Sequence, residues 1–148
     1  MATLCNEIII DALIEKVWEA LSKIEELEKY DPTVKRSRAL TPAGSGIGAI
    51  RKVDMKDGKN WFEEKVTIWK QNDALTYELT ACSFPIQQLK HGYRFEQIGY
   101  QTKVSQVMEY KVKYGLIGKI LDALMIRKQS DAGIKKFFAG LKSYIEKQ

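Results

Sequence analysis

The sequence predicts an α+β fold in which an antiparallel sheet of about seven strands packs against a long C-terminal helix, with two short helices after the first strand. Three observations support this prediction. Apolar and polar residues alternate from residue 49 to residue 114, which is the period of a half-buried sheet. The period becomes helical from residue 116 to the end. Asp57-Gly58 is a strong two-residue hairpin signal. We find no repeat and no linker in the 148 residues, so we expect a single domain, 1–148.

The first 48 residues supply the remaining elements. A β-like run covers residues 3–11. Apolar residues recur at helical spacing over residues 14–21 and again over residues 24–30, which predicts two short helices. A strand is expected over residues 34–41, and the stretch 42–48, rich in proline and glycine, is expected to form a turn region.

The turn signals also predict which side chains share a face of the sheet. Pairing outward from Asp57-Gly58 sets Arg51 opposite Glu64 on an otherwise apolar face. The other pairs expected there are Met55–Asn60, Val53–Phe62, Ala49–Val66 and Ile47–Ile68. The turn near Asn72-Asp73 predicts Ile68–Tyr77, Val66–Leu79 and Glu64–Ala81, and the turn at Gly99-Tyr100 predicts Phe95–Val104, Tyr93–Gln106, His91–Met108 and Leu89–Tyr110. The outer face should then carry Ile50, Trp61 and Trp69, the only apolar candidates for an exposed contact surface.

The apolar stripe of the C-terminal helix is the expected cover for the inner face of the sheet. The residues expected to face the sheet are Ile117, Leu121, Leu124, Ile134, Phe138, Leu141 and Ile145. A straight helix of about 32 residues would be ~48 Å long, which is more than a domain of this size covers. We therefore expect either a bend at residues 130–133 or an overhang at one end.

Composition and charge argue against several classes of function. The net charge is +5, but the basic residues are spread over solvated faces, so we expect no nucleic-acid partner. No apolar run approaches the ~18 residues of a membrane helix, and no secretion signal is recognised. We expect a cytoplasmic protein without an integral membrane segment, in which Cys5 and Cys82 are reduced. We further expect a monomer or weak homodimer that uses no cofactor.

The candidates for catalysis are Glu64 and His91, each of which could act as an acid or a base. His91 is the only histidine, so we expect no metal site, because a catalytic zinc needs three protein ligands. No triad-like arrangement is found around either cysteine. The possible partners of His91 are Tyr93, Gln106 and Glu64. The structural alternatives, which we favour, are a buried ion pair between Arg51 and Glu64 and a core histidine bonded to one neighbour.

Large apolar side chains and a few polar ones share the predicted inner face. This combination is typical of a pocket that buries an apolar ligand and orients it through a few polar groups. The residues expected to contact such a ligand are Arg51, Phe62, Glu64, Tyr77, His91, Tyr93, Phe95, Gln106, Met108, Tyr110 and Phe138. Small residues on the covering helix, at 132–133 and 139–140, favour a hollow core over a filled one.

Several segments, in this order, resemble the START-like (SRPBCC) superfamily and in particular its bacterial polyketide cyclase/dehydrase-like branch. The segments are Ile10–Leu21, Tyr30–Val34, Gly46–Arg51, Glu64–Val66 with Trp69, Leu75–Tyr77, and Gly115–Leu121 with Leu141-Lys142. Two departures are visible: Leu13 stands where a proline is common, and Tyr30 stands where a tryptophan is frequent. Neither departure threatens the fold.

The resemblance implies a helix-grip fold, in which a curved sheet wraps around the last helix and leaves a hydrophobic cavity. Proteins of this kind bind lipids, steroids, polyketides, quinones or plant hormones, some are cyclases or hydrolases, and a related branch activates a heat-shock ATPase. Because one fold carries so many functions, three hypotheses remain. The preferred one is a binding or carrier protein for a hydrophobic small molecule such as a lipid, polyketide or aromatic compound. The others are a cyclase, dehydratase or hydrolase acting on such a molecule, and a protein-interaction module that assists another protein.

Overall fold

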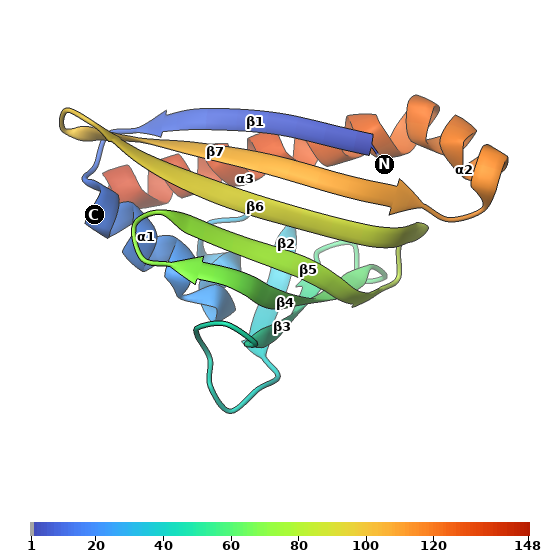
Figure 1. The fold of residues 1–148 in the computed structure, drawn as a ribbon, viewed down its shortest axis with the longest axis horizontal. Coiled ribbons are helices and arrows are strands. Elements are labelled where there is room, and N and C mark those ends of the chain that lie inside the picture. The colour runs from blue at the N-terminus through green and yellow to red at the C-terminus, as the bar shows by residue number, and fades with distance from the viewer. Residues whose placement is uncertain (1) are drawn as a thin grey trace.

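The computed structural model describes residues 2–148; Met1, with which the expected domain begins, lies outside the described residues. One antiparallel sheet contains the strands β1 (Ala2–Ile10), β2 (Val34–Ala39), β3 (Ile50–Met55), β4 (Trp61–Lys70), β5 (Ala74–Cys82), β6 (Ile86–Ile98) and β7 (Gln101–Val112). The strand order is β1-β7-β6-β5-β4-β3-β2, so the first strand pairs with the last one (Figure 1). The predicted fold class, a curved antiparallel sheet around a long C-terminal helix, is confirmed.

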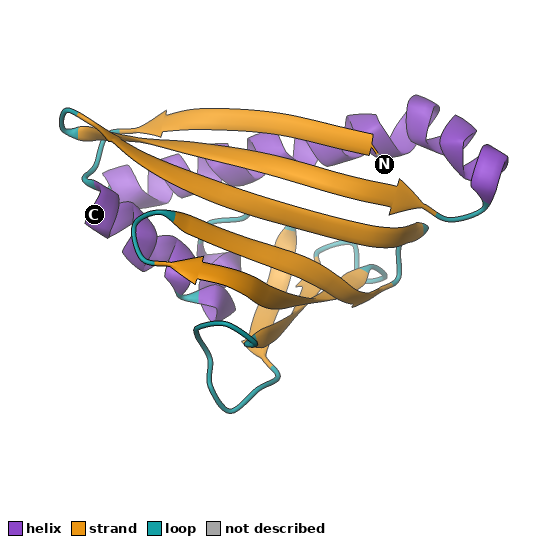
Figure 2. Ribbon diagram, viewed as in Figure 1, coloured by secondary structure: helices purple, strands orange, loops and turns teal. Residues whose placement is uncertain are grey.

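The helices lie mainly on one face of this sheet. After β1 come α1 (Ile14–Ser22) and a 3₁₀ segment, η1 (Ile24–Lys29); after β7 come α2 (Gly115–Leu121), a π-helical turn, η2 (Asp122–Ile126), and α3 (Arg127–Glu146). Figure 2 shows α3 running behind the sheet, and the backbone of α3 lies closest to β1. Among residues 2–148, no helix has both the length and the apolar character needed to cross a bilayer.

The core forms where α3 meets the concave face of the sheet. The buried side chains of α3 are Ile134, Phe137, Phe138, Leu141 and Ile145. They repeat at helical spacing and thus form one apolar stripe. The helix also approaches the segment after η1 closely, because a Cβ added at Gly140 would lie 1.9 Å from the carbonyl oxygen of Tyr30. A side chain larger than hydrogen is therefore excluded at this contact.

Two of the three predicted hairpin registers are observed. In β3 and β4, Arg51 pairs with Glu64 and Val53 with Phe62. In β6 and β7, all four predicted pairs are present, including His91 with Met108 and Tyr93 with Gln106. The turn chemistry therefore determined the register of both hairpins.

The predicted β4–β5 pairs are wrong, because irregularities interrupt this ladder. Glu64 pairs with Leu79 and Val66 with Tyr77, after which Thr67 is skipped and Ile68 pairs with Thr76. The shift of two residues at Glu64 and Val66 keeps both side chains on the inner face, because strand side chains alternate with a period of two.

The residue skipped at Thr67 reverses the alternation in the last part of β4. Trp69, expected on the outer face, packs against the core, with its ring centroid 5.2 Å from that of Trp18. An extra residue in one strand has this effect on all the side chains that follow it. The predicted pairing of Ile47 with Ile68 is also wrong, since Ile47 is exposed in the loop between β2 and β3.

The prediction for the start of the C-terminal helix is partly wrong. Ile117 and Leu124 do not face the sheet and are 69% and 71% exposed. The helical irregularity is η2, not residues 130–133, and α2 overhangs the end of the sheet, as the second alternative anticipated (Figure 1). The physical reason is that β7 ends at Val112, so α2 has no sheet beneath it to cover.

Candidate ligand-binding cavity

A cavity of about 510 Å³ lies between the inner face of the sheet and the C-terminal helical segment. Of the residues predicted to contact a ligand, those that line it are Arg51, Phe62, Glu64, His91, Tyr93, Gln106 and Met108. The other four, Tyr77, Phe95, Tyr110 and Phe138, do not line the cavity and are buried in the core. The cavity is therefore formed by only part of the inner face.

Sequence reasoning missed the lining residues that come from helices and loops. The apolar ones are Leu27, Phe84, Pro85, Leu121, Met125, Ile126, Ile134 and Phe137. Their elements reach the cavity only through tertiary packing, so strand alternation carries no signal for them. Phe137 could have been found, because it neighbours Phe138 on α3 and both are buried.

A buried polar cluster of Arg51, Glu64 and His91 lies in the wall of the cavity. The Arg51 Nε donates a hydrogen bond of 2.7 Å to Glu64 Oε1, and its Nη2 lies 2.6 Å from the same oxygen. The Arg51 Nη1 donates to the carbonyl oxygen of Ile24 at 2.9 Å. His91 Nε2 lies 2.7 Å from Glu64 Oε2. Both carboxylate oxygens are thus bonded, one to each partner.

Tyr77 supports this cluster from β5, the strand between β4 and β6. Its ring stacks on the ring of His91 with 5.1 Å between centroids and 15° between planes. The guanidinium carbon of Arg51 lies 4.3 Å from the centroid of the same ring. An arginine over an aromatic face is attracted by the ring quadrupole. Tyr77 therefore positions the cluster although it does not line the cavity.

Glu64 is ionised in this environment. Burial by itself would raise the pKa of Glu64, but the charge of Arg51, together with His91 and the hydrogen bonds from both, lowers that pKa to about 2. Because an ionised carboxylate only accepts hydrogen bonds, His91 Nε2 must donate to it. In a neutral imidazole, Nδ1 then carries no proton and is an acceptor. Among the described residues, His91 Nδ1 has no hydrogen-bond partner.

A second buried polar pair, Tyr93 and Gln106, lies beside the first. Gln106 Nε2 donates to the hydroxyl oxygen of Tyr93 at 3.1 Å. Burial raises the pKa of Tyr93, so its hydroxyl keeps a proton that it can donate. Gln106 Oε1 has no partner within residues 2–148. The tyrosine ring also meets the His91 ring edge to face at 5.6 Å. His91, Tyr93 and Gln106 thus form one polar patch with unused hydrogen-bonding capacity.

The described residues contain no group of three or more His, Cys, Asp or Glu side chains arranged to hold a metal ion. Cys5 and Cys82 are both free thiols. Cys82 lines the cavity, while Cys5 is exposed on β1.

The chain matches a known protein family over almost its whole length. Residues 1–146 match the model of the family described as polyketide cyclase / dehydrase and lipid transport. The chain belongs to this family. The predicted resemblance to the START-like superfamily and its polyketide cyclase/dehydrase-like branch is therefore confirmed. A comparison with curated proteins by sequence found no match.

Solved structures share the fold of this polyketide cyclase / dehydrase and lipid transport family member. A START superfamily protein from Mycobacterium smegmatis is 15% identical, with a TM-score of 0.81 over 98% of this chain and 97% of the other. A protein of Thermus thermophilus is 16% identical, with a TM-score of 0.81 over 97% of both chains. The di-domain ARO/CYC protein BexL of the BE-7585A biosynthetic pathway is 11% identical, with a TM-score of 0.80 over 99% of this chain and 47% of BexL. Family and fold together indicate a START-like protein that binds hydrophobic ligands.

Proposed function

We propose that this protein binds and carries a hydrophobic small molecule in the cavity between the sheet and α3. The observation that carries the proposal is the cavity itself. Its volume of about 510 Å³ falls within the range of small-molecule sites, and its wall is mainly apolar with a few polar groups gathered together. Burying about 200 Å² of apolar ligand surface at ~25 cal/mol per Å² gives about 5 kcal/mol before the cost of association. Binding through apolar contacts alone is therefore weak to moderate.

The polar end of the ligand is held by His91, Tyr93 and Gln106. Arg51 contributes little, because its guanidinium already bonds Glu64 and the carbonyl of Ile24. With His91 neutral, the free groups are two acceptors, His91 Nδ1 and Gln106 Oε1, and one donor, the Tyr93 hydroxyl. A ligand hydroxyl both donates and accepts, so it can satisfy this set, whereas a carboxylate only accepts. The cavity should therefore prefer an apolar alcohol or phenol to the corresponding acid.

Gly133 offers a direct test of whether the cavity is the binding site. Gly133 lines the cavity, and a Cβ added there meets no other atom within 4 Å. Gly133→Leu should therefore project into empty space, while replacing a glycine inside a helix stabilises it by about 0.5–1 kcal/mol. Delipidated protein should bind 2-naphthol by fluorescence titration, and Gly133→Leu should weaken binding at least tenfold without loss of thermal stability. Gly133→Ala is the matched control with a smaller effect.

The choice between hydroxyl and carboxylate is tested with two probes that share the naphthalene ring and differ in the polar group. Wild-type protein should bind 2-naphthol more tightly than 2-naphthoic acid, and Gln106→Leu, which removes one of the two free acceptors, should reduce that difference. Val107→Ala, on the exposed side of β7, should change neither affinity. The proposal is overturned if neither probe binds to the wild-type protein, or if Gly133→Leu binds 2-naphthol as tightly as wild type does.

An enzyme of the cyclase, dehydratase or hydrolase type is the second candidate, and the Glu64–His91 contact favours it. An imidazole oriented by a carboxylate at 2.7 Å is the arrangement of a general base. Any ligand that co-purifies should then be converted, with a change in mass or in chromatographic retention time, on incubation with wild-type protein but not with His91→Phe. A ligand unchanged in both properties with both proteins argues for the carrier.

A further inference from the structure

The outward side of α2 and η2 is apolar, although it faces solvent. Leu116, Ile117, Ile120 and Leu124 are 75%, 69%, 54% and 71% exposed. Counted from Leu116, the other three follow at one, four and eight residues, which places all four on one side of the helical segment. Isolated exposed apolar residues are ordinary, but a contiguous set on one element marks an interaction surface.

Contacts with β7 and with the turn that follows it hold α2 and η2 in this orientation. Tyr114 and Gly115 both have positive φ, which turns the chain sharply from β7 into α2. Gly118 then packs against the end of β7, where an added Cβ would lie 1.8 Å from the carbonyl oxygen of Lys113. The Tyr110 hydroxyl donates a hydrogen bond to Asp122 Oδ1. The apolar side is thus fixed outward by contacts on the opposite side of the segment.

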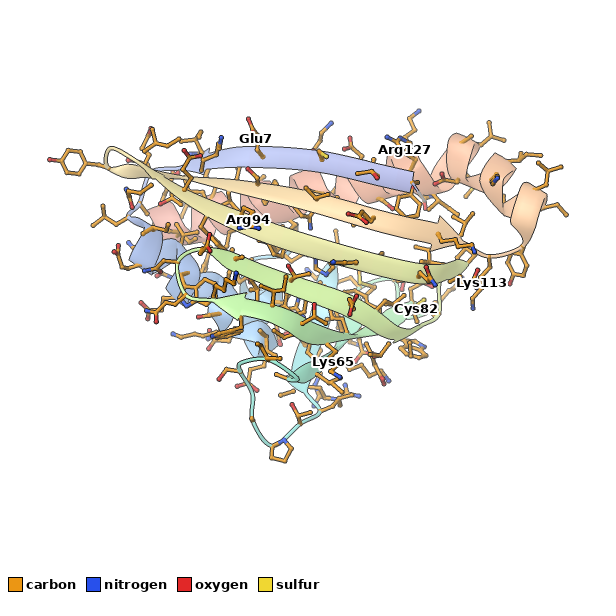
Figure 3. All side chains as sticks on the ribbon, viewed as in Figure 1. Glu7, Lys65, Cys82, Arg94, Lys113 and Arg127 are labelled. Atoms are coloured by element: carbon orange, nitrogen blue, oxygen red, sulfur yellow. The ribbon has the colours of Figure 1, made fainter. Side chains whose placement is uncertain are left out.

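Basic residues surround the apolar side. Lys113, Lys119 and Lys128 are exposed, and none forms a salt bridge within residues 2–148. The one acidic residue from 113 to 128, Asp122, is engaged by Tyr110. Figure 3 shows Lys113 at the end of β7 and Arg127 beside β1, both at the end of the sheet that α2 overhangs. The surface is therefore apolar at its centre and positive at its edge.

We propose that this overhang surface, formed by Leu116, Ile117, Ile120, Leu124, Lys113, Lys119 and Lys128, docks on an anionic lipid bilayer. An amphipathic helix with apolar and lysine side chains binds in the plane of such a surface, because its apolar side enters the acyl boundary and its lysines meet anionic headgroups. A second copy of this chain fits less well, since two such surfaces would bring their lysines together.

The position of the surface relative to the cavity connects docking with ligand exchange. Leu121, Met125 and Ile126 of the same helical segment line the cavity. Met125 is also 51% exposed, so the cavity wall meets the molecular surface at this segment. A molecule docked through the overhang surface holds its cavity next to the bilayer, which is a reservoir for an apolar ligand.

Flotation of the full chain with vesicles tests the proposal. The protein should float with vesicles of phosphatidylcholine and phosphatidylglycerol, and much less with phosphatidylcholine alone. Ile117→Ser/Leu124→Ser should reduce binding to anionic vesicles at least tenfold, and Lys119→Gln/Lys128→Gln should reduce it severalfold and weaken its dependence on salt. Ile47→Ser is the matched control, because Ile47 is 72% exposed in the β2–β3 loop, away from α2 (Figure 1), and should leave binding unchanged.

The proposal is overturned if the wild-type protein does not float, or if Ile117→Ser/Leu124→Ser floats as well as wild type. It is also overturned if sedimentation shows a dimer that the same double substitution dissociates, since the surface would then be a self-association interface. The docking surface stands separately from the ligand proposal: floating protein that binds no naphthol supports the first and contradicts the second.

Discussion

The C-terminal helical segment has two halves with the same apolar spacing and opposite burial. In α3, Leu141 is completely buried under the sheet, whereas Leu124, in η2, is 71% exposed. The difference comes from what lies opposite each half: the apolar side of α3 packs against the sheet, while the apolar side of α2 and η2 faces solvent. A helical apolar pattern in a sequence therefore indicates that the helix has an apolar side, but not what covers that side.

The largest effect is expected beneath α3, at the buried charges of the sheet. Arg51→Met leaves the ionised Glu64 with only His91 as a side-chain partner, and should reduce the free energy of unfolding by about 3–5 kcal/mol in urea denaturation. Arg51→Met/Glu64→Met removes both charges and should recover most of this loss. A cost below about 1 kcal/mol for the single substitution would show that water reaches this part of the cavity wall.

A similar or slightly smaller effect is expected in the core contacts of α3. Leu141→Ala removes a fully buried side chain and should lower the free energy of unfolding by about 2–5 kcal/mol. The measurement is again urea denaturation. A loss within the range of a surface substitution would mean that α3 does not grip the sheet as described.

Acid should reduce the stability of the fold by protonating the buried Glu64. The pKa of Glu64 is lowered from 4.5 to about 2 in the folded protein, so its ionisation stabilises the fold above pH 4.5. That stability is lost as the pH falls from about 4.5 towards 2, because the unfolded chain binds the proton first. Glu64→Gln has no carboxylate at this position to protonate. Its melting temperature should therefore fall less steeply over this pH range than that of wild type. Parallel curves for the two proteins would contradict the assignment.

The smallest effect is expected in the overhang, and it completes the comparison. Leu124→Ala is the same substitution as Leu141→Ala at a solvent-facing position, and should change the free energy of unfolding by less than about 0.5 kcal/mol. A large loss would show that Leu124 is covered in solution. That result would point to self-association, which sedimentation at two protein concentrations would reveal.

The polar residues of the candidate site were predicted better than its boundaries. The Asp57-Gly58 hairpin placed Arg51 opposite Glu64, and the Gly99-Tyr100 hairpin placed His91 on the same face. Glu64 was among the possible partners for His91, and the structure selects it, since Nε2 lies 2.7 Å from Glu64 Oε2. The selection depends on β5 lying between β4 and β6, where Tyr77 contacts the side chains of both His91 and Arg51.

The sequence by itself determined the order of the elements, the two tight hairpins and the inner face, because turn chemistry and side-chain period act over a few neighbouring residues. Only the tertiary structure decided the rest. The irregularity at Thr67 reversed Trp69, and the end of β7 left Ile117 and Leu124 without a partner. The tertiary structure also determined the cavity beside His91. A cavity is space that packed elements leave unfilled, and no local sequence pattern specifies the separation between those elements.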